Sequence, residues 1–310
     1  MAVVRRNSRQ SEVSWTPMLP RLVPVLFALA FATVSLASQA AAQTWESLPV
    51  NPQVEIAYIP PKSARLQPVY EALKQRRTLE ELQHFLAPLR LPHPLQLNTH
   101  ECGYVNMFYS NGPSEWSPKS RSINICYEWP KTLVDMAPQT VSPDGFVTRR
   151  EAIVGGLIGT ILHEGGHMLF DMLTVPVFGR EEDAADDNAA FLALQFNKDV
   201  ARLIINGVGY QWAKIGKDPD ALAPMRAWAD EHGTVSQRMY NTLCLGYGGD
   251  PQEFQEFVNR GWLPKKRAEH CGEEYAQLRL AFQKTVLPFI DHDLMIRVRQ
   301  TQWFTQEELK

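Results

Sequence analysis

Residues 161–170 read ILHEGGHMLF and hold the pentapeptide His163-Glu164-Gly165-Gly166-His167 inside an apolar run. An α-helix has about 3.6 residues per turn, so histidines four residues apart lie one above the other and both imidazoles can reach one ion. Glu164 lies about 100° around the helix from His163, where its carboxylate can contact a metal-bound water rather than the metal. This H-E-x-x-H pattern predicts a helix carrying a zinc site, with His163 and His167 as ligands and Glu164 as the general base.

A catalytic zinc site needs a third protein ligand and one open position. Residues 180–187 read REEDAADD and form the obvious source of a carboxylate ligand. Glu182 and Asp186 are four residues apart and therefore share one helix face. Glu182, Asp186 and Glu181 are the candidates for this ligand. Asp171, one turn after the second histidine, is a candidate hydrogen-bond partner for a ligand histidine.

The first 42 residues have the features of a secretory leader. Four arginines precede an apolar run from Leu22 to Leu36, and three small residues, Ala40 to Ala42, follow it. The run is shorter than the ~20 residues that span a bilayer. We therefore expect cleavage near Ala42, a periplasmic or secreted location, and no stable membrane span afterwards. An uncleaved membrane anchor is the alternative.

The composition excludes several classes of protein. The chain has 310 residues, of which 45% are hydrophobic and 21% charged, unlike disordered, coiled-coil or polytopic membrane proteins. The net charge is −3, and it becomes −6 when the leader takes four Arg and one Glu with it. This charge gives no reason to expect nucleic-acid binding. No repeat or linker divides residues 43–310, so we expect one domain.

The expected export affects how the four cysteines are interpreted, because disulfides form in oxidising compartments. Cys102 and Cys126 flank one segment, and Cys244 and Cys271 flank another, without the C-x-x-C spacing of a zinc ribbon. In an oxidising compartment the simplest interpretation is two local disulfides, Cys102–Cys126 and Cys244–Cys271. Four cysteines allow three connectivities, and four free thiols are the other alternative.

Hydrophobic periodicity predicts an α+β fold. The pattern indicates strands over 54–59, 98–109 and 122–129, helices over 69–87, 148–172 and 180–197, and short helices from 200 to 287. Strands early and helices late predict a small sheet packed on the long H-E-x-x-H helix, followed by a mostly helical C-terminal half.

The segment from Glu182 to Asp186 fits the pattern E-x-x-A-D, which resembles the second-helix signature of the gluzincin branch of zinc metallopeptidases. In that branch the Glu is the third zinc ligand, and the Asp hydrogen-bonds a ligand histidine. The resemblance therefore implies a zincin-like fold in which Glu182 binds zinc and Asp186 orients His163 or His167.

The order of the motifs along the chain resembles a family of bacterial exported metallopeptidases that is catalogued mainly as a domain of unknown function. The resemblance covers Val54 to Tyr275 and rests on these residues: Cys102-Gly103, Asn106, Phe108-Tyr109, Ile125 to Glu128, His232, Gln237-Arg238, Asn241, Cys244, Tyr247-Gly248, Leu263-Pro264, Arg267 and Cys271. It implies peptidase chemistry without naming a substrate. Gly165-Gly166 departs from related motifs, which commonly have a bulkier first residue.

These observations predict a zinc metallopeptidase that acts on a peptide or protein substrate. The alternatives are a zincin-like protein that binds peptides or partners without turnover, and a zinc hydrolase of a non-peptide amide such as a cell-wall linkage. An extended peptide could pair with the strand over 122–128. His232, Arg238 and Tyr240 are the candidates for stabilising an oxyanion.

Overall fold

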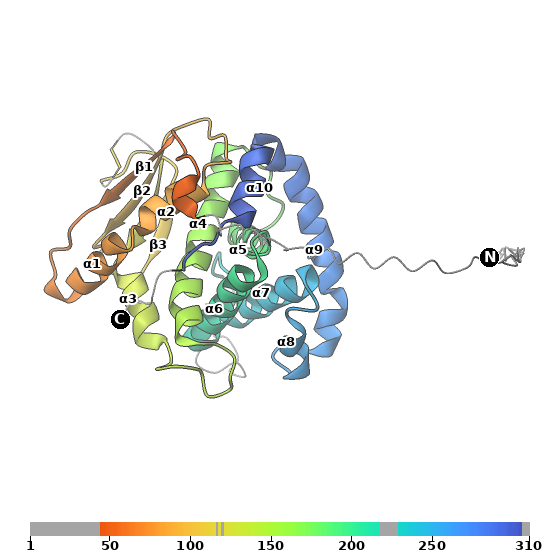
Figure 1. Ribbon diagram of the computed structural model, residues 1–310. Coiled ribbons are helices and arrows are strands. Elements are labelled where there is room, and N and C mark those ends of the chain that lie inside the picture. Colours follow the sequence, from red (N-terminus) through yellow and green to blue (C-terminus); the bar gives the residue numbers. More distant parts are fainter. Residues whose placement is uncertain (1–43, 116, 119–120, 217–228, 306–310) are drawn as a thin grey trace, which may run out of the picture. The chain divides into compact units, whose positions relative to one another are not determined.

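The computed structural model describes residues 44–115, 117–118, 121–216 and 229–305 (Figure 1). A four-stranded sheet comes early in the chain and helices dominate the later part, which confirms the predicted α+β class. The predicted leader, residues 1–42, lies outside the described residues. Within them, no helix combines the length and apolar character that crossing a membrane requires.

The sheet is mixed, with the strand order β1-β2-β4-β3. β1 (Val54–Tyr58), β2 (Leu95–His100) and β4 (Arg121–Cys126) run parallel, and β3 (Met107–Ser110) pairs antiparallel with β4 at one edge. The strand predicted over 98–109 is therefore two strands. Our expectation that a peptide pairs with the 122–128 strand is wrong, because β4 already has a neighbour on each side.

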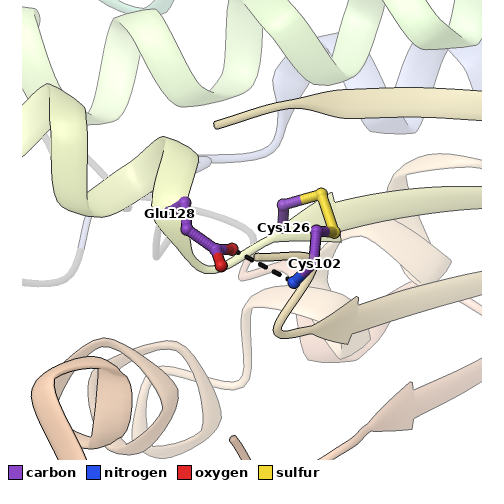
Figure 2. Close-up of side chains that lie close together, drawn as sticks. All are labelled: Cys102, Cys126 and Glu128. Carbon is purple, nitrogen blue, oxygen red and sulfur yellow. Dashed lines mark hydrogen bonds between the residues drawn. A yellow bond between two sulfur atoms is a disulfide. The ribbon is translucent and has the colours of Figure 1, made fainter. Parts of the chain in front are cut away.

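The predicted strand over 122–129 also ends early, because Glu128 begins α3 (Glu128–Met136). The Glu128 carboxylate accepts a hydrogen bond from the backbone N–H of Cys102 at 3.3 Å (Figure 2). It accepts a second one from the backbone N–H of Gly103 at 2.7 Å. Gly103 has φ of 83°, a left-handed conformation that suits glycine and turns the chain after β2. This turn separates β2 from β3.

Both predicted disulfides are present. Cys102–Cys126 ties the turn after β2 to the end of β4, and Cys244–Cys271 joins α7 (Val235–Gly249) to α9 (Lys265–Thr285). The described helices and helical turns are η1 (Trp45–Ser47), η2 (Ala64–Leu66), α1 (Gln67–Gln75), α2 (Thr78–Phe85), α3, η3 (Glu151–Gly155), α4 (Gly156–Met172), α5 (Glu181–Ala193), α6 (Lys198–Gly216), α7 (Val235–Gly249), α8 (Gln255–Asn259), α9 (Lys265–Thr285), η5 (Leu287–Phe289) and α10 (His292–Gln300).

Two helix predictions need correction. The single helix expected over 69–87 is α1 and α2, which separate at Arg77, a residue with φ of 55°. The short helices expected from 200 to 287 include the 19-residue α6 and the 21-residue α9. Two glycines of this part of the chain, Gly207 in α6 and Gly248 near the end of α7, lie at close contacts between helices. A Cβ at Gly207 would lie 2.3 Å from the Glu151 carbonyl oxygen, and one at Gly248 would lie 2.1 Å from the Cys271 carbonyl oxygen.

Helix α4 lies between the sheet and the helices of the C-terminal half (Figure 1). It carries the H-E-x-x-H pentapeptide and follows one π-helical turn, η3. Apolar residues on its buried faces, including Ile158, Leu162 and Leu169, belong to one continuous core. This packing on both sides fixes the position of the helix, and so it fixes the histidines.

Candidate metal centre

His163 and His167 on α4 and Glu182 on α5 converge on one point. The two Nε2 atoms are 3.3 Å apart. The Glu182 Oε2 atom lies 3.1 Å from Nε2 of His163 and 3.4 Å from Nε2 of His167. The predicted third ligand is thus brought to the histidine pair by a second helix.

Gly166 allows α5 to approach α4 this closely. A Cβ at this position would lie 3.0 Å from the Ala185 Cα, whereas a Cβ at Gly165 would meet no atom within 4 Å. The two glycines of the pentapeptide therefore have different surroundings. Gly166 lies at a tight contact between helix backbones, and Gly165 faces open space.

Carboxylates hold the outward nitrogens of both histidines. The His163 Nδ1 atom lies 2.8 Å from Oδ1 of Asp186, and the His167 Nδ1 atom lies 2.8 Å from Oε1 of Glu181. Arg238 donates to Asp186 through Nε at 2.6 Å and through Nη2 at 2.7 Å. Such contacts fix the ring orientation of a metal-binding histidine and direct its Nε2 toward the ion. The rival ligand Glu181 thus contacts the far side of His167.

The surroundings of Glu182 fit a metal ion. Its Oε2 atom is buried and accepts no hydrogen bond of acceptable geometry from a described residue, although imidazole nitrogens lie within 3.4 Å. A buried carboxylate oxygen needs a compensating positive charge. Zinc ligands about 2.0–2.1 Å from a tetrahedral ion are about 3.3 Å from one another, which matches the separations here. Two imidazoles and one carboxylate also form a donor set that zinc prefers.

The electrostatics of the centre favour a cation. Burial opposes a charge on His163, yet hydrogen bonds to Asp186 and Glu182 raise its pKa to about 9. Burial likewise opposes the Glu182 carboxylate, but contacts with His163, His167 and His232 hold its pKa well below the ordinary value. The negative side chains around the centre thus outweigh the cost of burying positive charge there.

Glu164 is buried beside this centre. Its Oε2 atom accepts the backbone N–H of Tyr109 on β3 at 2.8 Å. Burial raises the pKa of Glu164, while the two histidines and this N–H oppose the rise. The edge strand therefore holds one oxygen of the carboxylate.

Asp171 does not contact a ligand histidine. It accepts the Tyr109 hydroxyl at 2.7 Å and pairs with Nε of Arg121 at 2.5 Å. Asp171 therefore ties α4 to β3 and β4, next to the Glu164 contact. Neither Tyr109 contact has a local sequence signal, because both join residues more than 50 positions apart.

A cleft of about 950 Å³ opens over the centre. Its walls are β3, α4 and the chain leading into α5, and they include Glu164, His167 and Glu182. A smaller pocket of about 180 Å³ adjoins it, reaching from His163 and Glu164 inward. Most of its inner wall is apolar and comes from α5 and α6: Ala189, Ala190, Ile204, Ile205 and Val208.

Of the three oxyanion candidates, His232 reaches the cleft. Its Nε2 atom lies 2.9 Å from Oε2 of Glu182, and its side chain is 39% exposed. Arg238 is held by Asp186 and stacks on the Trp212 ring at 3.8 Å, so it is a structural ion-pair partner. Tyr240 lines neither the cleft nor the smaller pocket.

Comparisons with known proteins agree with this description. Residues 58–286 match the profile of a family, DUF4344, whose description is "Putative metallopeptidase". The matched range contains the histidine pair, Glu182 and all of the sheet except most of β1. Comparisons with curated proteins and with solved structures give no significant match. The match spans most of the chain, and the protein therefore belongs to this "Putative metallopeptidase" family.

Proposed function

We propose that this protein is a zinc-dependent metallopeptidase in which His163, His167 and Glu182 hold the zinc and Glu164 is the general base. The observation that carries the proposal is the convergence of three ligand atoms at 3.1–3.4 Å beside a buried glutamate and an open cleft. Family membership supports peptidase chemistry over other hydrolytic reactions.

A zinc ion held there would supply a Lewis acid that polarises a carbonyl and acidifies a bound water. Glu164 would accept a proton from the attacking water and return it to the leaving amine. The Tyr109 N–H binds Oε2 of this carboxylate, so Oε1 is the oxygen we assign to the proton. Burial favours the protonated form that the glutamate adopts between the two transfers.

The edge strand β3 is the place where an extended peptide would bind. Backbone groups alternate in direction along an antiparallel strand, and the Tyr109 N–H points away from β4 toward Glu164. The backbone of Met107, two residues earlier, shares that outward direction, and both residues line the cleft. A peptide added to this edge would pass over the metal centre, with one apolar side chain entering the smaller pocket. His232 is the donor we assign to the developing oxyanion.

The Glu164→Gln variant tests the mechanism. We expect hydrolysis of casein or a peptide library to fall by about 10²- to 10⁴-fold, the typical contribution of a general base. Zinc content should stay at the wild-type level, because Glu164 is not a ligand. Glu182→Ala should lose the zinc, whereas Asp183→Asn should keep it, because Asp183 pairs with Arg180 at the helix surface. Wild-type protein that holds one zinc yet cleaves only peptidoglycan amides, or nothing, would refute the peptidase assignment.

We also propose that residues 43–310 form a single exported domain after leader cleavage. The two disulfides support an oxidising compartment. The mass of the protein recovered from the periplasm or medium tests this. A mass that includes the leader would instead indicate a membrane anchor.

A further inference from the structure

An apolar cavity of about 440 Å³ lies on the opposite side of α4 from the metal centre. Ile161, Gly165 and Met168 line it, and helical geometry places them about 100–160° around the helix from the two histidines. The remaining walls come from the sheet and from α2, α5, α9 and α10, with Phe191 and Phe282 among the aromatic side chains. The cavity is separate from the cleft and from the smaller pocket.

The cavity is only partly closed to solvent, and its apolar walls lack contacts that a packed core would give them. Folded cores contain few voids larger than a water molecule, and each void costs contacts that its walls would otherwise make. Apolar cavities do not hold water stably, but they bind apolar molecules of matching size. Gly165 adds to the space, since no atom lies within 4 Å of the position of its missing Cβ.

The mouth of the cavity is positively charged. Arg279 on α9 and Arg299 on α10 line it, and both are exposed to solvent. Among the described residues no Asp or Glu lines the cavity, and no described residue pairs with the Arg279 guanidinium. Arg299 donates through Nε to the Gln195 carbonyl at 2.9 Å, which fixes its position at the rim. Two cations beside an apolar interior complement a ligand with an anionic head and an apolar tail.

We propose that this cavity binds a free long-chain carboxylate, such as a fatty acid, with its head between Arg279 and Arg299 and its tail along α4 past Gly165. The tail would replace the missing core contacts between α4 and α9. Binding would therefore stabilise the helix that carries the H-E-x-x-H residues, from the side remote from the substrate. The proposal does not depend on peptidase activity, because it concerns another face of the helix.

Myristate binding to the full mature protein, measured by calorimetry and by the shift in unfolding temperature, tests the proposal. We expect one molecule per chain and a higher unfolding temperature in its presence. The double variant Arg279→Gln/Arg299→Gln should weaken myristate binding about tenfold or more, because it removes charge-assisted hydrogen bonds. It should leave binding of methyl myristate, which lacks the charge, unchanged. Lys284→Gln, an exposed α9 charge outside the cavity, is the matched control and should bind like wild type.

Gly165→Leu provides an independent test, because its side chain would occupy the tail position. It should abolish binding of both ligands without lowering the unfolding temperature. Three outcomes would overturn the proposal: no binding of myristate to wild type, equal affinity for myristate and its methyl ester, or wild-type binding by Gly165→Leu. Co-sedimentation with phosphatidylglycerol vesicles without binding of free myristate would also overturn it, and would assign the cavity to membrane lipid.

Discussion

Asp186 contacts both a histidine of the metal centre and Arg238, so one carboxylate orients a ring and is itself held by a guanidinium. Asp186→Asn removes the charge that both partners need. We expect zinc affinity to fall about 10- to 100-fold, the usual effect of losing such a partner. Competition with a chromogenic chelator measures this.

Glu181→Gln should have a smaller effect, because the Glu181 side chain is 58% exposed and water can replace it at His167. Asp183→Asn is the control on the same helix and should leave the affinity unchanged. Equal zinc affinity in Asp186→Asn and wild type would show that the His163–Asp186 contact does not support metal binding.

Glu81 offers a prediction remote from the metal centre. Burial raises its pKa from 4.5 to about 7, although the Phe304 N–H donates to it at 2.6 Å. Between these values the unfolded chain releases a proton that the folded protein keeps, so stability falls as pH rises through this window. Glu81→Gln keeps a hydrogen-bond acceptor and no longer titrates. We expect it to be more stable than wild type at pH 8 and to lose that advantage near pH 4.5.

Urea unfolding at the two pH values measures this difference. Glu71→Gln, an exposed substitution on α1, serves as the control and should follow wild type at both. If the free energy of unfolding changed equally with pH in Glu81→Gln and wild type, the raised pKa of Glu81 would be contradicted.

At the scale of helices, the contact between α4 and α5 brings the three candidate ligands together. Gly166→Ala would place a Cβ 3.0 Å from the Ala185 Cα, so the two helices must separate. We expect a lower unfolding temperature and weaker zinc binding, since Glu182 moves with α5. The new Cβ in Gly165→Ala would meet no atom within 4 Å. This substitution should therefore stabilise the protein by about 1 kcal/mol, because alanine has a higher helix propensity than glycine. Thermal unfolding and chelator competition measure the unfolding temperature and the zinc affinity of the two variants. Equal unfolding temperatures and equal zinc affinities in Gly166→Ala and Gly165→Ala would refute the packing argument.

The helix pair α4 and α5, with its two glycines, also shows how much could be predicted from the sequence. The spacing of the histidines on α4 predicted that they share one face, and the E-x-x-A-D resemblance predicted that Glu182 joins them. The surroundings of each glycine could not be predicted, because they depend on which helix packs against which face. The same limit applies to the chain after residue 200, where Gly207 in α6 and Gly248 in α7 lie at close contacts with η3 and α9.

Other features that the sequence did not predict also depend on contacts between distant parts of the chain. The split at Arg77 and the start of α3 at Glu128 depend on a left-handed residue and on a carboxylate that binds a distant turn. Likewise, the Tyr109 N–H reaches Glu164 through the register of β3 beside α4. Local patterns carry no information about such long-range pairings.

At the scale of the whole molecule, the two disulfides contribute to stability in separate regions, one at the sheet and one between α7 and α9. They close loops with sequence separations of 24 and 27, so each is worth about 3 kcal/mol in the chain-entropy model. Domains of this kind have a total stability of about 5–15 kcal/mol, and reduction should therefore remove a large share of it.

The serine pairs Cys102→Ser/Cys126→Ser and Cys244→Ser/Cys271→Ser separate the two contributions. Each should lower the free energy of unfolding by about 3 kcal/mol, measured by urea titration with chelator present, because bound metal would add its own stabilisation. The sheet variant should also weaken zinc-dependent activity more than the helical one does, since β4 supports the edge strand that holds Glu164. If both pairs unfold at the wild-type urea concentration, the bridges do not constrain the unfolded chain, and the stability of the fold comes from its core alone.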